Sequence, residues 1–294
     1  MQEQYISLAD LRKVSGIGDK TIERIKAQLL QNELDDNYKS EYNPNIKLDI
    51  NNVYRGDCLE LMNGIPNKSI DMILCDLPYG MTWAKWDSII SFEDLWTQYN
   101  RIIKDNSAIV LFSSQPFTSK LINSNMKNYK YTWYWIKNIK GNYLNVKRQP
   151  LRQVEEINIF NKHKYFPQGI KEYNKIGRSG SGAKTTLQNY SNEWFQEKTG
   201  YPSNVLYYDL DKEKLHPTQK PIALCEYLIK TYTNEGEIVL DNCIGSGTTA
   251  IACINTNRNY IGFELNKEYY EIAKNRINQH IINNNLQEKY NLIA

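Results

Sequence analysis

The chain has 294 residues, of which 41% are hydrophobic and 23% are charged, a composition typical of a globular protein. The net charge is only +3, the mean hydropathy is −0.62, and no apolar run reaches about 18 residues, so we expect no membrane-spanning helix. The N-terminal residues lack the basic start and apolar stretch of a secretory signal. Five scattered cysteines without a CxxC pair, and three histidines without ligand spacing, argue against a disulfide framework or a metal site and predict a cytoplasmic protein.

The N-terminal segment has the pattern of a helical hairpin. In LADLRKVSGIGDKTIERIKAQL (8–29), two stretches with apolar residues on one face flank a Gly-Ile-Gly turn. The segment resembles a helix-hairpin-helix motif, whose glycine turn contacts DNA phosphate through backbone N–H groups. The predicted DNA contacts are Gly16, Gly18 and Lys20. The alternative is a plain helical hairpin that packs on a neighbouring element.

After the hairpin, short apolar runs alternate with amphipathic stretches. The predicted strands are 70–75, 108–112, 157–160, 237–241 and 260–265, and the predicted helices are 92–104, 222–232, 249–255 and 268–282. This alternation predicts an α/β domain, doubly wound around a mostly parallel sheet with both faces covered. The predicted organisation is a helical unit at 1–32, a linker at 33–46 and the α/β domain at 47–294.

An unusual tetrapeptide, Asp76-Leu77-Pro78-Tyr79, follows the predicted strand 70–75. Pro78 has no N–H and fixes the turn, so nearby carbonyls can face outward as acceptors. The Asp76 carboxylate and the Leu77 carbonyl can accept from an amino group, and the Tyr79 ring offers a face for a planar ring. Two acceptors beside a stacking ring suit the exocyclic amine of a flipped base. A simple strand-ending turn with a capping Asp is the alternative.

The segment 137–188 is strongly basic, with eleven Lys or Arg and three Asp or Glu. A basic surface with interleaved tyrosines and amides suits a phosphate backbone and exposed bases, whereas a solvated insertion is the alternative. We predict a target-recognition region at about 140–212 that includes a Gly/Ser-rich loop at 177–186. Its predicted DNA contacts are Lys140, Lys147, Arg148 and Arg152.

A glycine-containing turn follows the predicted strand 237–241 and leads into a helix. Gly245 and Gly247 let the backbone approach a ligand closely. Glu264 ends the next predicted strand seventeen residues after Gly247, where an acid can accept from ribose hydroxyls. An NAD site would look similar, but Ala250 stands where such a site usually has a third glycine.

A second polar segment, HPTQKP, precedes the predicted helix 222–232. Pro221 fits the first turn of that helix. Thr218 and Lys220 stand just before it, so a carboxylate could lie among a hydroxyl, an ammonium and free N–H groups.

DLPYG, HPTQKP, DNCIGSGTT and FEL, in this order, resemble the β class of DNA amino-methyltransferases over about residues 47–282. The resemblance implies a Rossmann-like fold, S-adenosylmethionine as cofactor, duplex DNA as partner, and adjacent strands before the tetrapeptide and the glycine turn. The implied catalytic residues are Asp76, Leu77, Pro78 and Tyr79. The implied cofactor-binding residues are Asp57, Cys58, Thr218, Lys220, Asp241, Gly245, Ser246, Gly247, Thr248, Thr249 and Glu264.

Two positions depart from the pattern of that class. Leu77 replaces the first proline of the tetrapeptide, which leaves the carbonyl acceptor but weakens the turn. Asp241-Asn242-Cys243 stands where the class usually has Asp-Pro-Phe, which changes the packing beneath the cofactor. The role of Asp57 rests on the resemblance alone, since an Asp in a surface turn would read the same.

An Asp at the first position of the tetrapeptide favours adenine N6 as the methylated amine, because cytosine-N4 enzymes of this class more often carry Ser. Cytosine N4 is the main alternative. A catalytically silent DNA-binding relative, a protein or RNA methyltransferase and an NAD enzyme are the others. A homodimer is one oligomeric state that the sequence is compatible with.

Overall fold

The computed structural model describes residues 41–80, 88–178, 193–212 and 219–293. The chain divides into one unit of Met1–Glu41 and a second of Tyr42–Ala294, and the described helices and strands belong to the second. The predicted helix-hairpin-helix unit and most of the predicted linker lie outside the described residues. The last linker residues already fold with the second unit, where the Asn43 N–H donates to the Asn63 carbonyl at 2.7 Å.

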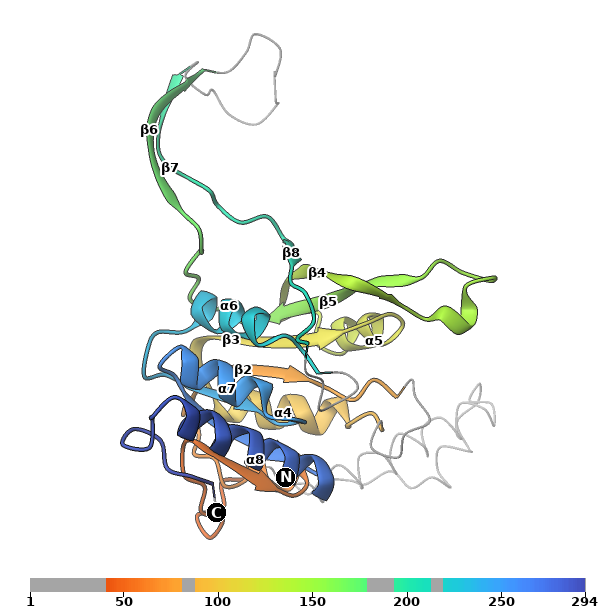
Figure 1. Ribbon diagram of the computed structural model, residues 1–294, viewed down its shortest axis with the longest axis vertical. Helices are drawn as coiled ribbons and strands as arrows, with labels where there is room; N and C mark the ends of the chain where they lie inside the picture. Colours follow the sequence, from red (N-terminus) through yellow and green to blue (C-terminus); the bar gives the residue numbers. More distant parts are fainter. Residues whose placement is uncertain (1–40, 81–87, 179–192, 213–218, 294) are drawn as a thin grey trace, which may run out of the picture. The chain divides into compact units, whose positions relative to one another are not determined.

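An eight-stranded sheet forms the centre of the second unit (Figure 1). Its strand order is β1 (Asn52–Arg55), β10 (Asn259–Glu264), β9 (Ile238–Asp241), β2 (Ile70–Asp76), β3 (Ile103–Ser113), β5 (Arg152–Phe160), β4 (Tyr129–Gly141) and β8 (Val205–Tyr207). The first five strands are parallel to one another, β5 is antiparallel to both β3 and β4, and β8 is parallel to β4. The predicted mostly parallel sheet is confirmed, with β5 running against the other strands of the described sheet.

Helices cover both faces of the sheet (Figure 1). The helices α6 (Ile222–Tyr232), α7 (Thr248–Asn255) and α8 (Lys267–Asn283) share one apolar cluster with the sheet, and α3 (Cys58–Met62), α4 (Phe92–Ile102) and α5 (Phe117–Ser124) share the other. Within the described ranges, no helix combines the length and apolar character needed to cross a bilayer. The predicted doubly wound α/β fold is therefore confirmed.

Strand β2 is apolar along most of its length because both of its faces are covered. Met72 and Leu74 belong to the cluster under α6, α7 and α8, whereas Ile73 and Cys75 belong to the opposite cluster. All four side chains are at most 1% exposed. Successive side chains of a strand point to opposite faces, so a strand covered on both faces needs apolar residues at every position. This burial accounts for the continuous apolar run in the sequence.

The five predicted strands are present as β2, β3, β5, β9 and β10, and the four predicted helices as α4, α6, α7 and α8. The predicted helix 92–104 is two residues too long, because β3 begins at Ile103 immediately after α4. Ser91 caps the start of α4 by accepting from the Asp94 N–H. The short elements β1, β8 and α3, together with α5 and β4, were not predicted.

Strands β6 (Lys171–Arg178) and β7 (Glu193–Thr199) form a separate two-stranded antiparallel sheet. In Figure 1 they form a ribbon that extends away from the layers of sheet and helices. The ribbon and the turn between β4 and β5 fall within the predicted recognition region 140–212. The first two residues of the predicted loop 177–186 belong to β6, and those from 179 onward lie outside the described residues.

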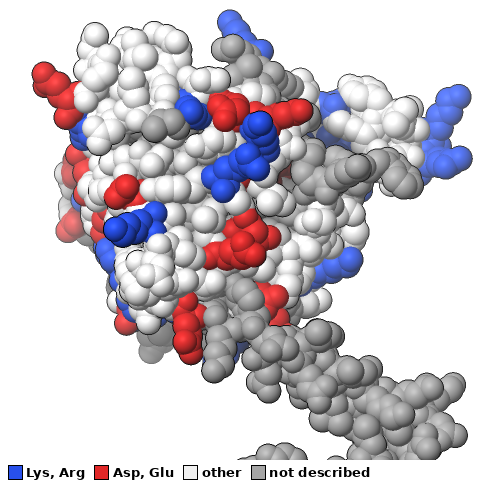
Figure 2. Space-filling view, turned by 90° about the horizontal axis from the view of Figure 1, so that it is seen from below, with Lys and Arg blue, Asp and Glu red and all other residues white. Residues whose placement is uncertain are grey.

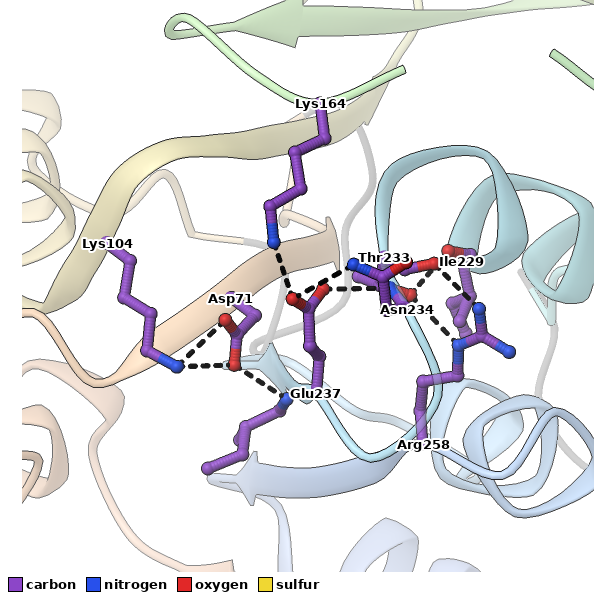
Figure 3. A network of polar contacts seen from close by, with 9 residues as sticks. Asp71, Lys104, Lys164, Ile229, Thr233, Asn234, Glu237 and Arg258 are labelled. Atoms are coloured by element: carbon purple, nitrogen blue, oxygen red, sulfur yellow. Dashed lines mark hydrogen bonds and ion pairs between the residues drawn. The ribbon is translucent and has the colours of Figure 1, made fainter. Parts of the chain in front are cut away.

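A polar network joins the amino ends of β2 and β9 (Figure 3). Asp71 accepts from Lys104 Nζ at 2.8 Å and from the Ile238 N–H at 3.0 Å. Arg258, which is 7% exposed, donates to the Thr233 carbonyl at 2.6 Å. Buried charged and polar groups need such partners, so the network fixes these strand ends. It leaves the carboxyl ends of the same strands available for a cavity.

Candidate active site

A cavity of about 580 Å³ lies at the carboxyl ends of β2 and β9. The two strands are neighbours, with Met72 opposite Val239, but the chain continues from β9 to β10 on one side and from β2 to β3 on the other. Parallel strands whose connections diverge leave a crevice at their carboxyl ends. The Asp76–Tyr79 turn and the 241–246 turn therefore line one cavity. The predicted adjacency of the two strands is confirmed.

The Asp76–Tyr79 turn is fixed by a hydrogen bond within the turn and by packing of its side chains on neighbouring apolar residues. Asp76 ends β2, and its side chain is 23% exposed. The Tyr79 hydroxyl donates to Asp76 Oδ1 at 2.6 Å, and the Tyr79 ring stacks on Phe117 with centroids 5.0 Å apart. Leu77 is 4% exposed and packs into the cluster shared with α3, α4 and α5. This apolar anchor holds the turn at the position where the predicted pattern has a proline.

Four charged side chains meet at the wall of the cavity: Asp76, Glu155 of β5, Lys137 of β4, and Lys220. Lys220 Nζ forms a hydrogen-bonded ion pair with Asp76 Oδ2 and lies 3.3 Å from Glu155 Oε2. Lys137 Nζ donates to Glu155 Oε1 at 2.8 Å. The Lys220 side chain is 8% exposed and lies over the Phe112 ring, 5.1 Å from its centroid. Its ammonium thus contacts carboxylates of the protein, and the expected contact with a ligand carboxylate stays a prediction.

The electrostatics of this cluster favour a charged lysine between two carboxylates. Burial is the largest influence on Asp76 and raises the pKa of its carboxyl, against the opposing effect of Lys220. Burial would also raise the pKa of Glu155, but Lys220 and Lys137 outweigh burial and lower it. Burial disfavours the ammonium of Lys220, yet Asp76 and Glu155 raise its pKa above the usual value. Lys220 therefore stays protonated at neutral pH.

The glycine turn after β9 is fixed by the end of the neighbouring strand β10. Gly245 and Gly247 have φ of 54° and 83°, the left-handed region that glycine adopts without strain. Glu264 Oε2 accepts from the Gly245 N–H at 2.9 Å, and Oε1 accepts from the Asn266 N–H at 2.8 Å. Gly245 and Glu264 line the cavity, whereas Gly247 lies against Ile277 of α8.

The start of α7 supplies hydroxyl groups to the same wall. Ser246, Thr248 and Thr249 all line the cavity. Arg276 Nη1 donates to the Ser246 carbonyl and to Thr248 Oγ1, each at 3.0 Å. The Ser246 hydroxyl donates to Gln219 Oε1 at 3.2 Å. Contacts from α8 and from the segment before α6 thus hold the helix start in place.

The Asp241 carboxylate accepts hydrogen bonds from groups of the glycine turn and of the helix that follows it. Its Oδ2 accepts from Thr249 Oγ1 at 2.6 Å, and its Oδ1 accepts from the Cys243 N–H at 3.1 Å. Burial raises the pKa of its carboxyl to about 7, against the opposing hydrogen bonds from Thr249 and Cys243. Asn242 accepts from the Tyr99 hydroxyl at 2.5 Å, so the residue in the place of the usual proline ties the turn to α4.

We expect Asp241→Asn to change how stability depends on pH. The folded state keeps the Asp241 proton up to about pH 7, while the unfolded chain loses it near pH 4. This residue therefore stabilises the fold most at low pH, and its contribution falls as pH rises toward 7, by at most about 1.4 kcal/mol per unit. Urea unfolding at several pH values should show that the free energy of unfolding of the variant rises relative to that of the wild type between pH 4 and 7. A difference in unfolding free energy between variant and wild type that stays constant over this pH range would contradict this assignment.

Asp57 and Cys58 line the cavity from the start of α3. Asp57 is the N-cap of that helix, and its Oδ1 accepts from the Leu59 N–H at 2.8 Å. Cys58 is buried and is hydrogen-bonded by Asn242 Nδ2 at 3.6 Å. The capping role explains an Asp at this position without a ligand, so the predicted cofactor contact stays a prediction.

The predicted DNA contacts of the recognition region lie on the β4–β5 hairpin. Lys140 is near the end of β4, Arg152 begins β5, and Lys147 and Arg148 lie in the turn between them. All four are exposed, and the sequence from 138 to 154 contains no acid. On the face shown in Figure 2, by contrast, basic and acidic side chains are interspersed. The other predicted DNA contacts, Gly16, Gly18 and Lys20, lie outside the described residues, as does Thr218, which was predicted to bind the cofactor.

Several residues of the cavity wall were missed by sequence reasoning. Lys137, Glu155, Phe112, Trp135 and Tyr269 line the cavity without belonging to any motif. The available signal was a pair of acids at 155–156, directly before a predicted strand and within a strongly basic segment. Such a pair indicates that a carboxylate is required in this basic segment, but it does not show which lysine or arginine that carboxylate contacts.

The comparisons with known proteins agree with this geometry. The family model N6_N4_Mtase, described as DNA methylase, matches residues 70–275. The type II methyltransferase M.HpaI of Haemophilus parainfluenzae is 30% identical over 75% of this chain and 72% of its own length. The DNA adenine methyltransferase YhdJ of Escherichia coli is 28% identical over 76% of this chain and 82% of its own. The crystal structure of the M1.HpyAVI–SAM complex superposes with a TM-score of 0.53 at 26% identity, covering 76% of this chain and 98% of that one.

Proposed function

Because the chain belongs to the N6_N4_Mtase family of DNA methylases, we propose that it transfers a methyl group from S-adenosylmethionine to the N6 amine of an adenine flipped out of duplex DNA. One observation carries the proposal: the Asp76 turn and the glycine turn line the same cavity. A site for an amine and a site for a nucleoside-like donor in one cavity favour direct transfer between two bound ligands.

The donor side of the cavity fits S-adenosylmethionine, the methyl donor of this family. Gly245 brings the backbone to the wall, and Glu264 and Asp57 supply carboxylates there. Each oxygen of Glu264 accepts one backbone N–H and retains a lone pair for a ribose hydroxyl. When bound, the donor would supply a methyl group that its sulfonium already activates: the S–CH3 bond breaks as the N–CH3 bond forms, the sulfur leaves as a neutral thioether, and the amine nitrogen gives up one proton. The residues of the chain need only hold the two reactants in line.

The role we propose for the tetrapeptide follows from the chemistry of the base amine. This amine is a weak nucleophile because its lone pair is delocalised into the ring. Hydrogen bonds from its N–H groups to the Asp76 carboxylate and the Leu77 carbonyl stabilise the positive charge that develops on nitrogen. Tyr79, held by Phe117 and Asp76, presents its ring as a support for the base.

Adenine is proposed over cytosine because the tetrapeptide begins with Asp76, and because YhdJ is described as an adenine methyltransferase. The name of the family covers both the N6 and the N4 amines, so a cytosine-N4 enzyme is the second candidate. Duplex DNA as substrate is supported by the exposed basic residues Lys140, Lys147, Arg148 and Arg152 near the carboxyl edge of the sheet.

A methylation assay with the full chain tests this proposal. Duplex DNA is incubated with the purified protein and tritiated S-adenosylmethionine, and the product is read by single-molecule sequencing. We expect tritium in DNA and N6-methyladenine at one short sequence. N4-methylcytosine would overturn the choice of base. Calorimetric binding of the donor without any transfer would overturn the enzymatic function and indicate a silent DNA-binding relative.

A further inference from the structure

Glu155 is a charged residue of the cavity wall to which the proposed reaction gives no role. Its Oε1 accepts from Lys137 at 2.8 Å. Its Oε2 is buried and has no hydrogen-bond donor in the described part of the chain, although Lys220 Nζ lies only 3.3 Å away. The same ammonium is hydrogen-bonded to Asp76. Glu155 therefore already forms an ion pair with Lys220, and its Oε2 can still accept a hydrogen bond from that ammonium.

Asp76 differs, because one of the groups already bound to its carboxylate is an ammonium. Oδ1 accepts from the Tyr79 hydroxyl and Oδ2 accepts from Lys220, so each oxygen retains one lone pair. The proposed reaction needs Asp76 to accept from the base amine, which would then lie beside the Lys220 ammonium. An ammonium beside that amine would also repel the positive charge that develops on its nitrogen. Lys220 therefore has to leave Asp76 before methyl transfer.

Lys220 cannot leave by moving into solvent. Its side chain is 8% exposed and lies over the Phe112 ring. A buried ammonium that loses its carboxylate is strongly destabilised unless another partner takes its place. Glu155 Oε2 is within ion-pair distance, and Lys137 on Oε1 helps to keep that carboxylate ionised and oriented.

We propose that Glu155 is a positioning residue that takes the Lys220 ammonium from Asp76 when the target amine enters, and so makes Asp76 available to that amine. In the structure, the Lys220 ammonium occupies a hydrogen-bonding position on the Asp76 carboxylate beside the one that the amine needs. The exchange leaves the Lys220 ammonium paired with Glu155, and the Asp76 carboxylate accepts from the amine on which positive charge develops. This inference rests on the proposed methyl transfer to an amine.

The inference predicts a distinctive pH profile. The titratable groups that act on the Lys220 ammonium are Asp76 on β2, Glu155 on β5 and Cys225 on α6. Lys137 on β4 contacts Glu155, Tyr79 after β2 contacts Asp76, and Asp241 at the end of β9 lines the same cavity. Asp76 and Glu155 together keep Lys220 protonated. Without Glu155, the ammonium has no carboxylate bonded to it once it has left Asp76, so its pKa falls in that state. Raising the pH then deprotonates Lys220, and the neutral amine no longer forms an ion pair with Asp76.

The test compares Glu155→Gln with Glu156→Gln, its neighbour on the opposite face of β5, which accepts from Thr118 Oγ1 at 2.5 Å. We expect Glu155→Gln to lower the single-turnover methylation rate at neutral pH by about ten- to a hundredfold. Donor binding by calorimetry should be unchanged, and Glu156→Gln should retain the wild-type rate. The ratio of the Glu155→Gln rate to the wild-type rate should rise from about pH 7 to about pH 9.5 as the lysine loses its proton.

A ratio that stays constant with pH, or a Glu155→Gln rate equal to that of wild type, would overturn the inference. A double-mutant cycle with Lys220→Gln gives a second readout that does not depend on pH. If Glu155 acts through Lys220, Glu155→Gln should add little in the Lys220→Gln background, and additive losses would contradict the inference. The pH series stands alone if Lys220→Gln does not fold. Absence of transfer by the wild type would overturn the proposed function itself.

Discussion

Replacing Asp76 with alanine is expected to abolish methyl transfer while S-adenosylmethionine still binds. Alanine removes the carboxylate that accepts from the amine as positive charge develops, and the loss of one such group costs about a hundred- to a thousandfold in rate or more. Donor affinity should change little, because the wall formed by Gly245 and Glu264 does not use Asp76. Single-turnover transfer of tritium to DNA and calorimetric titration of the donor measure the two effects separately.

The matched control is Asp105→Ala on β3, whose side chain is 87% exposed in a surface ion pair with Lys68. It should retain full activity, since exposed ion pairs contribute little to stability. Circular dichroism should show that Asp76→Ala is folded, because the buried Lys220 ammonium keeps its ion pair with Glu155 in this variant. A folded Asp76→Ala variant that methylates DNA at the wild-type rate would refute the role assigned to this carboxylate.

Replacing Gly247 with valine is expected to abolish donor binding and to destabilise the domain. A side chain at this left-handed position is strained, and its Cβ would lie 3.1 Å from Ile277 Cδ1 and 3.4 Å from Ala273 Cα. Together the strain and the crowding against α8 should lower the free energy of unfolding by about 2–4 kcal/mol. Because Gly247 adjoins the turn that lines the cavity, the same displacement should remove donor affinity. Urea unfolding and calorimetry test these two effects.

Gly236 provides a control with nearly the same backbone conformation. Its φ is 78°, but nothing lies within 4 Å of a Cβ built there, and it is remote from the cavity lining. Gly236→Val should therefore lose only the cost of left-handed strain, about 1–2 kcal/mol, and should keep donor binding and transfer. Equal destabilisation by the two substitutions would show that packing of the glycine turn against α8 is unimportant.

The two turns that line the cavity could be found from sequence because each directly follows an apolar strand. In a mostly parallel sheet, the carboxyl ends of such strands share one edge, so residues after strand 70–75 and after strand 237–241 must lie on the same side. The order β9–β2 then brings them together. The turn forms without the first proline of the class tetrapeptide, because Leu77, which stands in its place, anchors the turn in the apolar cluster.

Glu155 could not be assigned to the site in the same way, because the direction of β5 has no sequence signal. In a fully parallel sheet, residues that precede a strand lie at the edge opposite Asp76. Since β5 runs antiparallel to β3, its first residues lie at the carboxyl edge of β2 instead. The partner of Lys220 was missed for a related reason: 144 residues separate it from Asp76, and only the packed fold sets their contact.

The separate β6–β7 sheet has a consequence for how this protein can diversify. Its strands pair with each other, while the eight-stranded sheet carries the cavity. Insertions, deletions and substitutions in the ribbon therefore leave the register of the central strands unaltered. Natural variation can accumulate there under weak structural constraint, and descendants of one ancestor can differ widely in this appendage while they inherit the same chemistry.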